Sequence, residues 1–596
     1  MQKYNIGGDM FKLLKNFTKK EWLVTFICFV LIFIQVWLEL KMPDYMSEIT
    51  KLVQTQGSKM QDILINGGYM LLCAFGSLLA AIFTGYITSK LSSKFAKNLR
   101  KKIFSKVEDM GMEEIKKFST SSLITRTTND VTQIEMLVAM GLQLLIKAPI
   151  TAIWAITKIL NKNWEWSAIT GVAVVILLSV IGALMIIVLP RFKKVQKLID
   201  KLNEVTRENL TGIRVVRAFN AEKYQEEKFE KANSNLTNQQ LFNQRAFSVM
   251  QPVMYLVMHF VTLGIYFVGA YLIDGAAFAD KIVLFGDMIV FSSYALQVIM
   301  SFLMLAMIFM MLPRAQVSAN RINEVLDTDI SIKDGRINAS DAKEIGTVEF
   351  KDVSFKYPDA DEYLLKDISF KANRGETVAF IGSTGSGKST LINLVPRFYD
   401  ATDGEILVDG INVKDYSQYS LHNKIGYVPQ KAVIFNGTVA SNIAYGDNGK
   451  DKATIEEVKK AIEVAQGKDF VEKMDNQYEG HIAQSGTNIS GGQKQRLAIA
   501  RAIARNPEIY IFDDSFSALD YKTDSVLRKE LKKYTKDATS LIVAQRIGTI
   551  MNADKIIVLD NGKIVGQGTH KELLKNCEVY NQIALSQLSK EELENG

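Results

Sequence analysis

The stretch "VAFIGSTGSGKST", residues 378–390, decides the fold of the back half of this chain of 596 residues. Its apolar start leads directly into Gly382-Ser383-Thr384-Gly385-Ser386-Gly387-Lys388-Ser389, which satisfies the pattern G-x-x-x-x-G-K-[ST]. Glycines let the backbone curl so that successive N–H groups point at phosphates, and a helix beginning near Lys388 adds its positive end. The sequence therefore predicts an α/β domain whose strand–loop–helix unit binds phosphates, with Lys388 on the outer phosphates and Ser389 on Mg²⁺.

A second acidic stretch, "YIFDDSFSALD" at residues 510–520, belongs to the same prediction. Asp513 ends the apolar strand "EIYIF", where a carboxylate can hold a metal ion through water, as a phosphate-loop site requires. Any buried strand could end in an aspartate by chance. The pairing with the loop at 382–389 favours the metal-binding interpretation.

The front half of the chain has a different composition, because it contains six long apolar stretches. Each is long enough for a membrane helix, which needs about 20 residues; they lie at about 22–43, 63–88, 136–160, 166–190, 249–273 and 282–312. A single one could be a buried soluble helix, but six with polar connections predict a six-span α-helical membrane domain. The first run lacks a small-residue cleavage site and is followed by further spans, which favours a span over a removed signal peptide.

Positive charge predicts the orientation of these spans, since cytoplasmic connections carry the excess of lysine and arginine. Cations are dense before the first span, from Lys3 to Lys20, and between Lys90 and Arg126. The connections at 44–62, 161–165 and 274–281 carry few cations. Both chain ends are therefore expected on the cytoplasmic side of a cell membrane.

The change of composition after Pro313 predicts the domain boundaries. The connections at 89–135 and 191–248 are charged and helically periodic, so we expect helices that continue out of the membrane. The expected parts are a membrane domain of residues 1–320, a linker at 321–345, a nucleotide-binding domain at 346–585 and a tail at 586–596.

Charge and cysteine content exclude other classes of protein. The formal net charge of +7 is modest and does not suggest a nucleic-acid partner. The three cysteines, Cys28, Cys73 and Cys577, form no C-x-x-C pair, so neither a disulfide framework nor a zinc site is expected.

The segment "NISGGQKQR", residues 488–496, resembles the signature of the ABC transporter superfamily, with Ile489 in place of the usual leucine. The resemblance covers nearly the whole chain: "YVPQ" with Gln430, "SALD" at 517–520 and the aromatic in "FKYPD", Tyr357, match its other motifs. The segments "FSTSSLITRTTNDV" and "ENLTGIRVVRAFNAE" resemble the intracellular helices of its multidrug and lipid exporter branch.

This resemblance implies ATP and Mg²⁺ as ligands. It implies that Tyr357 stacks on adenine and that Ser389, Gln430 and Asp513 bind the metal ion. The catalytic positions that it implies are 514 and 545. The remaining ATP-binding residues that it implies are Gly382, Ser383, Thr384, Gly385, Ser386, Gly387, Lys388, Thr390, Ser490, Gly491, Gly492 and Gln493.

The chain departs from the family pattern at the hydrolytic step. Asp514 stands where the family has a glutamate that polarises water, and Gln545 in "LIVAQRIGT" replaces a histidine that contacts the γ-phosphate. A carboxylate shorter by one methylene retracts by about 1 Å, and a misplacement of that size can cost on the order of 100-fold in rate. Gln545 cannot carry positive charge towards the developing phosphate charge. A third departure is "AQSG" at 483–486, where this branch usually shows "GERG".

In ABC proteins ATP lies between the phosphate loop of one chain and the signature of another. Because the signature at 490–493 is intact, the chain resembles the degenerate-site subunit of a heterodimeric bacterial exporter. It would bind ATP with little hydrolysis while its signature completes a competent site on a partner. Two alternatives stay open: a homodimeric exporter slowed by tolerated substitutions, and an ATP-gated regulator or channel that does not pump. A soluble ABC ATPase is excluded by the spans.

The sequence of the membrane half does not identify the cargo, which could be a drug, a lipid or a hydrophobic peptide. Methionines at helical spacing suit varied apolar ligands, although contact with lipid or packing between helices explains most of them better; they are Met300, Met304, Met307, Met310 and Met311. Polar side chains in or near the spans are candidates for the cargo path or for the membrane interface; they are Lys147, His259, Asp287 and Gln297.

Overall fold

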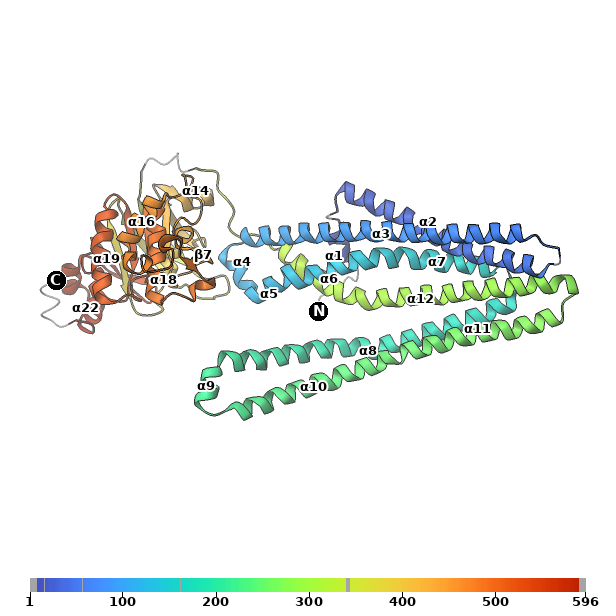
Figure 1. The fold of residues 1–596 in the computed structure, drawn as a ribbon. Coiled ribbons are helices and arrows are strands. Elements are labelled where there is room, and N and C mark those ends of the chain that lie inside the picture. The colour runs from blue at the N-terminus through green and yellow to red at the C-terminus, as the bar shows by residue number, and fades with distance from the viewer. Residues whose placement is uncertain (1–7, 16, 56, 161, 339–343, 589–596) are drawn as a thin grey trace. The chain divides into compact units, whose positions relative to one another are not determined.

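The computed structural model describes residues 8–15, 17–55, 57–160, 162–338 and 344–588. Residues 339–343 of the expected linker, 589–596 of the expected tail and Lys3 lie outside this description. The chain forms two compact units. The helical unit comprises Met1–Glu108 and Thr120–Thr328, and the sheet unit comprises Asp109–Ser119 and Asp329–Gly596 (Figure 1).

The helical unit is built from long helices that extend well beyond the apolar stretches. α12 continues to Leu326 and α3 to Glu108 through charged sequence, and α12 does so past Pro313. The bounds are α1 Gly8–Leu14, α2 Lys19–Gln54, α3 Met60–Glu108, α5 Thr120–Thr125, α6 Val131–Met136, α7 Leu142–Leu160, α8 Trp164–Thr211, α9 Ile213–Ala218, α10 Glu222–Ser248, α11 Met250–Asp274 and α12 Phe278–Leu326. Two π-helical turns, η1 Arg126–Asp130 and η2 Leu137–Gly141, flank α6.

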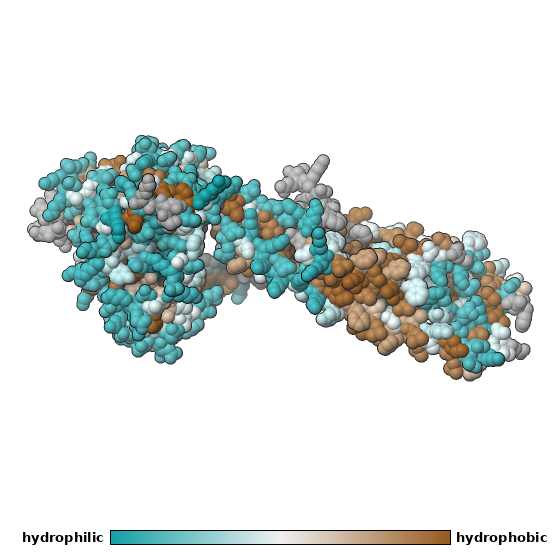
Figure 2. All heavy atoms as spheres, turned by 90° about the horizontal axis from the view of Figure 1, so that it is seen from above, coloured by the Kyte–Doolittle hydropathy of each residue, from teal (hydrophilic) through white to brown (hydrophobic). Residues whose placement is uncertain are grey.

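Among the residues that the structure describes, six helical stretches of this unit are long and apolar enough to cross a membrane. Leu71 and Phe267 illustrate their surface, since these side chains are 73% and 77% exposed. Figure 2 shows a band of apolar side chains over the helical unit, whereas the sheet unit is mostly hydrophilic. Helices that are apolar on their outer faces require a lipid environment. The predicted six-span membrane domain is confirmed.

Half-buried ion pairs lie among the apolar helices of the helical unit. Lys147 and Asp287, two of the polar residues named above, both take part in such pairs, while His259 is exposed and Gln297 is half-buried. Two lysines of α7 and one just after its end each pair with a carboxylate of α2 or α12: Lys147 with Glu39, Lys158 with Asp44 and Lys162 with Asp287. Pairing lowers the cost of placing these charges within the spans.

The sheet unit contains a six-stranded sheet in the order β12-β11-β3-β10-β9-β6, a four-stranded antiparallel sheet β2-β1-β4-β5 and the pair β7-β8. Strands β11, β3, β10, β9 and β6 run parallel. The strands are β1 Val348–Phe355, β2 Leu365–Ala372, β3 Thr377–Gly382, β4 Asp403–Val408, β5 Ile411–Asn412, β6 Ile425–Val428, β7 Gly437–Thr438, β8 His481–Ile482, β9 Ile509–Asp513, β10 Thr539–Val543, β11 Lys555–Asp560 and β12 Lys563–Gly568.

Two hydrophobic cores cover the two faces of the parallel sheet. In β3, Val378 and Phe380 belong to one core, and Ala379 and Ile381 belong to the other. Alternate side chains of a strand point to opposite faces, so a strand apolar at every position is buried on both sides. The helices of this unit are α4 Met112–Lys117, α13 Lys388–Asn393, α14 Gln418–Asn423, α15 Val439–Ile443, α16 Ile455–Val464, α17 Lys468–Val471, α18 Gly491–Ala504, α19 Tyr521–Tyr534, α20 Ile547–Ile550, α21 His570–Asn576 and α22 Glu578–Leu585.

A buried lysine links the two sheets of this unit. Lys424 Nζ donates to Asp409 Oδ2 at 2.7 Å and to Glu508 Oε2 at 2.8 Å. Burial lowers the pKa of Lys424, but its hydrogen bonds to both carboxylates outweigh burial and leave the pKa above its ordinary value. Asp409 Oδ1 also accepts from the Thr347 amide, so this group satisfies backbone and side-chain donors together.

We predict that Lys424→Met destabilises the sheet unit by about 3–5 kcal/mol, because it leaves the Asp409 carboxylate buried without its cationic partner. Lys460→Met is the matched control, since Lys460 pairs with Glu463 at an exposed site and should cost less than about 1 kcal/mol. Amide hydrogen exchange of β4 and β6 in the full chain measures the opening free energy. Equal protection in both variants would contradict the prediction.

Candidate functional site

The loop after β3 closes tightly around the space in which phosphates are expected. A Cβ on Gly382 would come within 2.0 Å of the Leu559 carbonyl oxygen, and one on Gly387 would meet Leu365 at 2.6 Å. Gly387 also has a φ of +94°, in the left-handed region that favours glycine. The glycines of the motif are therefore required by close approach and by backbone conformation.

Lys388 lies at the first residue of α13 with its ammonium group folded back on the loop. Its Nζ donates to the carbonyl oxygens of Gly382 at 2.9 Å and Ser383 at 2.7 Å, and to Ser386 Oγ at 3.3 Å. Burial lowers the pKa of Lys388, although the negative charges of Asp514 and Asp513 act in the opposite direction and raise it. Its three donors are thus held at the loop, where phosphate oxygens can replace the carbonyl acceptors.

Ser389 and Asp513 meet at the next position of the site. Ser389 Oγ donates to Asp513 Oδ1 at 2.7 Å, and Asp513 is the last residue of β9. Burial is the main cause that raises the pKa of the Asp513 carboxyl. A hydroxyl and a carboxylate oxygen in contact are hard oxygen donors, the kind that Mg²⁺ prefers. The two residues fit the metal role predicted for them.

Asp514 makes a direct contact with Gln545. Gln545 Nε2 donates to Asp514 Oδ2 at 2.7 Å, and Gln430 Nε2 approaches the same oxygen at 3.4 Å. Asp514 has a φ of +46°, so its side chain leaves the strand in a left-handed turn, and its pKa is raised mainly by burial. Gln545 and Gln430 therefore converge on one carboxylate oxygen of Asp514.

An aromatic cluster flanks the start of α13. Tyr357 packs edge-to-face against Tyr399, with ring centroids 5.3 Å apart, and its hydroxyl lies 3.0 Å from Thr390 Oγ1. The ring is thus held next to the helix that carries Lys388 and Ser389. An aromatic face at this place suits stacking of a nucleotide base.

Lys116, on α4, was not identified from the sequence. Its Nζ lies 4.6 Å from the ring centroid of Tyr357 and 5.3 Å from that of Tyr399. The Tyr399 hydroxyl is the main cause that raises the pKa of Lys116. Nothing in the sequence distinguishes this lysine from its charged neighbours, because only the packing of Asp109–Ser119 within the sheet unit brings it to the aromatic pair.

The signature residues form the start of α18. Ser490 Oγ accepts from the Gln493 amide at 3.3 Å, and the Gln493 side chain accepts from the Ser490 amide at 2.8 Å. This reciprocal cap leaves Gly491 open, since a Cβ there would meet nothing within 4 Å. Across the described residues, no hydrogen bond joins 490–493 to the phosphate loop. The capped helix end is available to a ligand supplied from outside this site.

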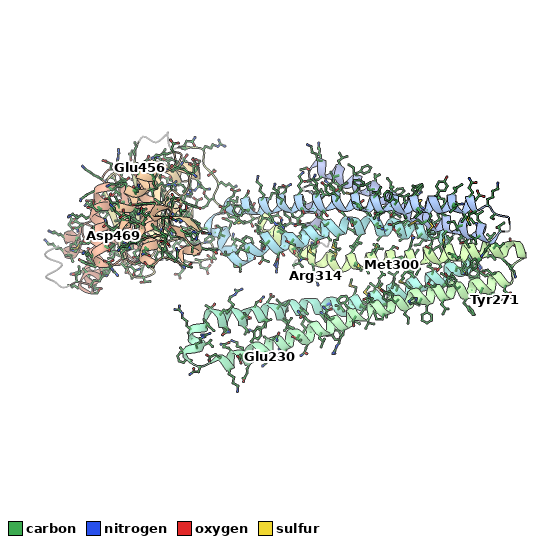
Figure 3. All side chains as sticks on the ribbon, viewed as in Figure 1. Glu230, Tyr271, Met300, Arg314, Glu456 and Asp469 are labelled. Carbon is green, nitrogen blue, oxygen red and sulfur yellow. The ribbon has the colours of Figure 1, made fainter. Side chains whose placement is uncertain are left out.

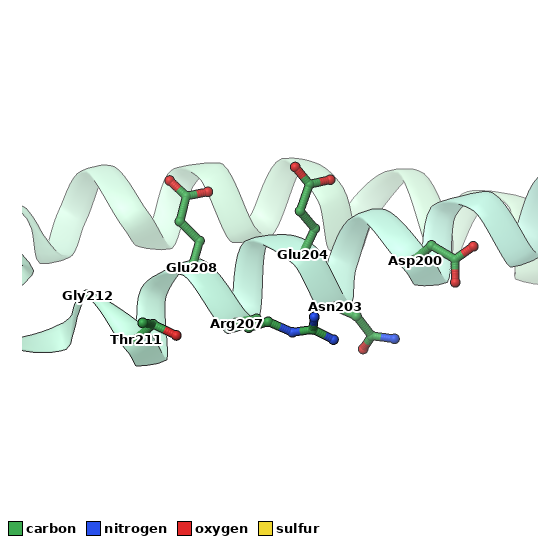
Figure 4. Close-up of a pocket in the computed structure, with 7 residues that line it drawn as sticks. All are labelled: Asp200, Asn203, Glu204, Arg207, Glu208, Thr211 and Gly212. Atoms are coloured by element: carbon green, nitrogen blue, oxygen red, sulfur yellow. The ribbon is translucent and has the colours of Figure 1, made fainter. Parts of the chain in front are cut away.

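A hollow along α8 has different chemistry and belongs to a solvated helix face. It measures about 760 Å³. Figure 4 shows Glu204 and Glu208 one turn apart on one side of α8, with Arg207 on another side. Glu208 pairs with Lys228 of α10 at 2.7 Å, and Glu204 pairs with Lys201 at 3.0 Å. Glu204 and Glu208 are therefore explained as surface ion-pair partners, one along α8 and one between α8 and α10.

Comparison with known proteins agrees with this geometry. The family described as "ABC transporter transmembrane region" matches residues 25–302, and the family described as "ABC transporter" matches residues 365–517. An uncharacterized ABC transporter ATP-binding protein of Mycobacterium tuberculosis is 40% identical over 522 residues, which are 87% of each chain. This chain belongs to the ABC transporter family.

This ABC transporter is also similar in sequence to a lipid flippase and in fold to a solved exporter. An ATP-dependent lipid A-core flippase of Pseudomonas aeruginosa is 32% identical, over 83% of this chain and 80% of the flippase. A bacterial Atm1-family ABC exporter, solved with ATP bound, shares the fold with a TM-score of 0.79 and 24% identity, over 94% of this chain and 97% of the exporter. The chain is a multi-pass membrane protein that binds ATP and couples its hydrolysis to transport.

We predict that Lys388→Ala lowers the affinity of this transporter chain for ATP at least tenfold while AMP binding changes little, because the ammonium group serves the outer phosphates. Lys366→Ala, an exposed cation of the same unit, should leave both affinities unchanged. Calorimetric titration of the full chain with each nucleotide measures the difference. A similar loss of AMP and ATP affinity would contradict the role of Lys388 at the outer phosphates.

Proposed function

We propose that the chain is one half of a heterodimeric exporter whose own site binds Mg-ATP but hydrolyses it poorly. Its signature completes the competent site on the partner chain. The observation that carries the proposal is the 2.7 Å hydrogen bond from Gln545 to Asp514, at the two positions where the family pattern is altered.

Hydrolysis requires a carboxylate oxygen positioned to accept a hydrogen bond from the attacking water. In this chain Gln545 donates to Asp514 Oδ2, and Gln430 lies within reach of the same oxygen. The shorter side chain of aspartate keeps that oxygen near the strand end, and a neutral amide adds no positive charge for the transition state. These features support ATP binding without efficient turnover.

The residues of the phosphate loop fit Mg-ATP as the ligand. Lys388 would hold the outer phosphates, Ser389 and Asp513 would hold Mg²⁺, and Tyr357 would stack on the base. When bound, Mg²⁺ would neutralise charge on the phosphates. Gln430 would sense the metal ion from its place beside Asp514.

The signature at 490–493 supports the partner's role in the proposal. Its helix end is capped by Ser490 and Gln493, and Gly491 lets a phosphate group approach the backbone. Binding of two ATP molecules would draw the two nucleotide-binding domains together, and the intracellular helices would transmit this motion. Hydrolysis at the partner's site would then reset the exporter.

We propose a hydrophobic or amphipathic cargo, moved across a bacterial cell membrane by a chain whose two ends are cytoplasmic. The lipid A-core flippase among the relatives supports an amphipathic lipid within this class. The exposed apolar helices of the helical unit provide the contact with the bilayer. A second half-transporter encoded beside this chain, with glutamate and histidine at the equivalent positions, would support the heterodimer.

We predict that the chain purified without its partner hydrolyses ATP very slowly, and that Asp514→Glu or Gln545→His alone recovers little. The double variant should recover more than the sum of the two, because both groups act on one transition state. Phosphate release by the four proteins, each saturated with Mg-ATP, provides the measurement. Rapid hydrolysis by the unmodified chain would leave a homodimeric exporter in place of the degenerate-site subunit.

We also predict that Ser490→Ala lowers phosphate release by the co-purified assembly more than Asp514→Ala does, since the signature serves the partner's site. Thr454→Ala is the matched control, because Thr454 caps α16 through the same reciprocal hydrogen bonds with Glu457. It separates the loss of a helix cap from the loss of a ligand contact. The opposite order of the two effects would locate the competent site in this chain.

A further inference from the structure

A cavity of about 420 Å³ lies in the helical unit where three helical segments meet. This volume is typical of small-molecule sites, which measure about 300–1,000 Å³. α6 and η2 contribute three side chains, and α10 and α12 contribute two each. The lining residues are Gln133, Met136, Leu137, Gln244, Phe247, Met311 and Arg314.

The lining of this cavity is apolar on one part and cationic on another. Met136, Leu137, Phe247 and Met311 supply flexible or flat apolar surface. Two amides and the Arg314 guanidinium supply polar donors, and none of the seven lining residues is acidic. A guanidinium binds carboxylate and phosphate groups through paired hydrogen bonds. The chemistry of the cavity therefore suits an anionic group that carries an apolar chain.

The cavity lies at the level where the helices change from apolar to charged sequence. α10 ends at Ser248 with strongly polar composition, and the apolar helix α11 begins at Met250. On α12, Arg314 is two residues beyond the end of the apolar stretch at 282–312. An amphiphile at such a boundary places its charged end in the polar layer and its chain in the apolar layer.

A stripe of methionines leads from the cavity along α12. Met300, Met304, Met307 and Met311 precede Arg314 at alternating spacings of four and three residues, which places them on one helix face. Met300 and Met307 are 44% and 52% exposed, and Figure 3 labels Met300 and Arg314 on this helix. Methionine adapts its shape to varied apolar ligands, so the stripe provides a surface for the chain of an amphiphile.

The backbone is irregular at the same place. The π-helical turn η2 begins at Leu137, which lines the cavity, and ends at Gly141. π-Turns interrupt α-helices frequently at functional sites. Met140 lies within this turn and is half exposed, so a second helix presents methionine beside the cavity-lining Met136.

We propose that this cavity binds the charged end of an amphipathic anion, with Arg314 pairing with its carboxylate or phosphate group and the methionines contacting its apolar chain. This inference rests on the proposed export function and narrows its cargo to anionic amphiphiles. It gives the methionine stripe, which nucleotide chemistry does not use, a role in accepting the apolar chain.

Binding of 11-(dansylamino)undecanoic acid and of its methyl ester to the full chain in phosphatidylcholine nanodiscs, without nucleotide, tests the proposal. Arg314→Gln should weaken binding of the acid at least tenfold and leave binding of the ester unchanged. Arg314→Lys should retain most of the affinity for the acid. Arg217→Gln, which changes an exposed cation on α9 outside the cavity, is the matched control and should bind as the unmodified chain does.

A second variant on another helix keeps the test independent of one substitution. Gln133→Glu adds a carboxylate to the cavity and should also weaken binding of the acid but not of the ester. Unchanged affinity of the acid in both variants would overturn the proposal, and so would equal losses for acid and ester. Because no nucleotide is present, this outcome is separate from the ATPase measurements on Asp514 and Gln545.

The same discs distinguish two sources of the anionic group. Phosphatidylglycerol added to the discs should compete with the acid in the unmodified chain if a bilayer lipid occupies the cavity. If phosphatidylglycerol does not compete while the acid still depends on Arg314, the occupant is a free amphiphile. Both results require the Arg314-dependent binding that the proposal predicts.

Discussion

The register of the parallel sheet is the constraint on which the nucleotide site depends. Val543 of β10 lies opposite Phe380 of β3 and Asp513 of β9, so these strands end at nearly the same level. The strand ends and the loops that follow them carry the glycines of the phosphate loop, the two aspartates and Gln545. Ligands of α/β sheets bind at this carboxyl edge, because several loops reach one place there. A shift of register by one residue would separate Asp514 from Gln545.

The parts of the structure with their own local chemistry could be predicted from the sequence. Phosphate binding dictates the spacing of glycine, lysine and serine at 382–389, and the bilayer dictates the length of the six apolar stretches. The contact between Asp514 and Gln545 could not be predicted, because it depends on two side chains from different loops. Lys116 was missed for the same reason, since Asp109–Ser119 shows no motif and is placed by packing within the sheet unit.

The helical unit combines an apolar exterior with half-buried ion pairs between its helices. The pairs made by Lys147 and Lys158 on α7, and by Lys162 just after it, join this part of the chain to α2 and α12, and their partners lie more than 100 residues away in sequence. Sequence patterns therefore identify these charges without identifying their partners. The same limit applies to the cavity at Arg314, which three distant segments form. The sequence shows the methionine spacing on α12, whereas a ligand-binding role for Arg314 at the end of that stripe is indicated only by the cavity.

We propose above all that this chain binds Mg-ATP and hydrolyses it slowly because of the contact between Asp514 and Gln545. The most direct test is the identity of the nucleotide that stays bound. The chain purified without its partner is incubated with Mg-ATP, separated quickly from free nucleotide and denatured, and the released ATP and ADP are quantified by chromatography. We expect mainly ATP from the unmodified chain and mainly ADP from the Asp514→Glu, Gln545→His double variant. Mainly ADP from the unmodified chain would contradict the account.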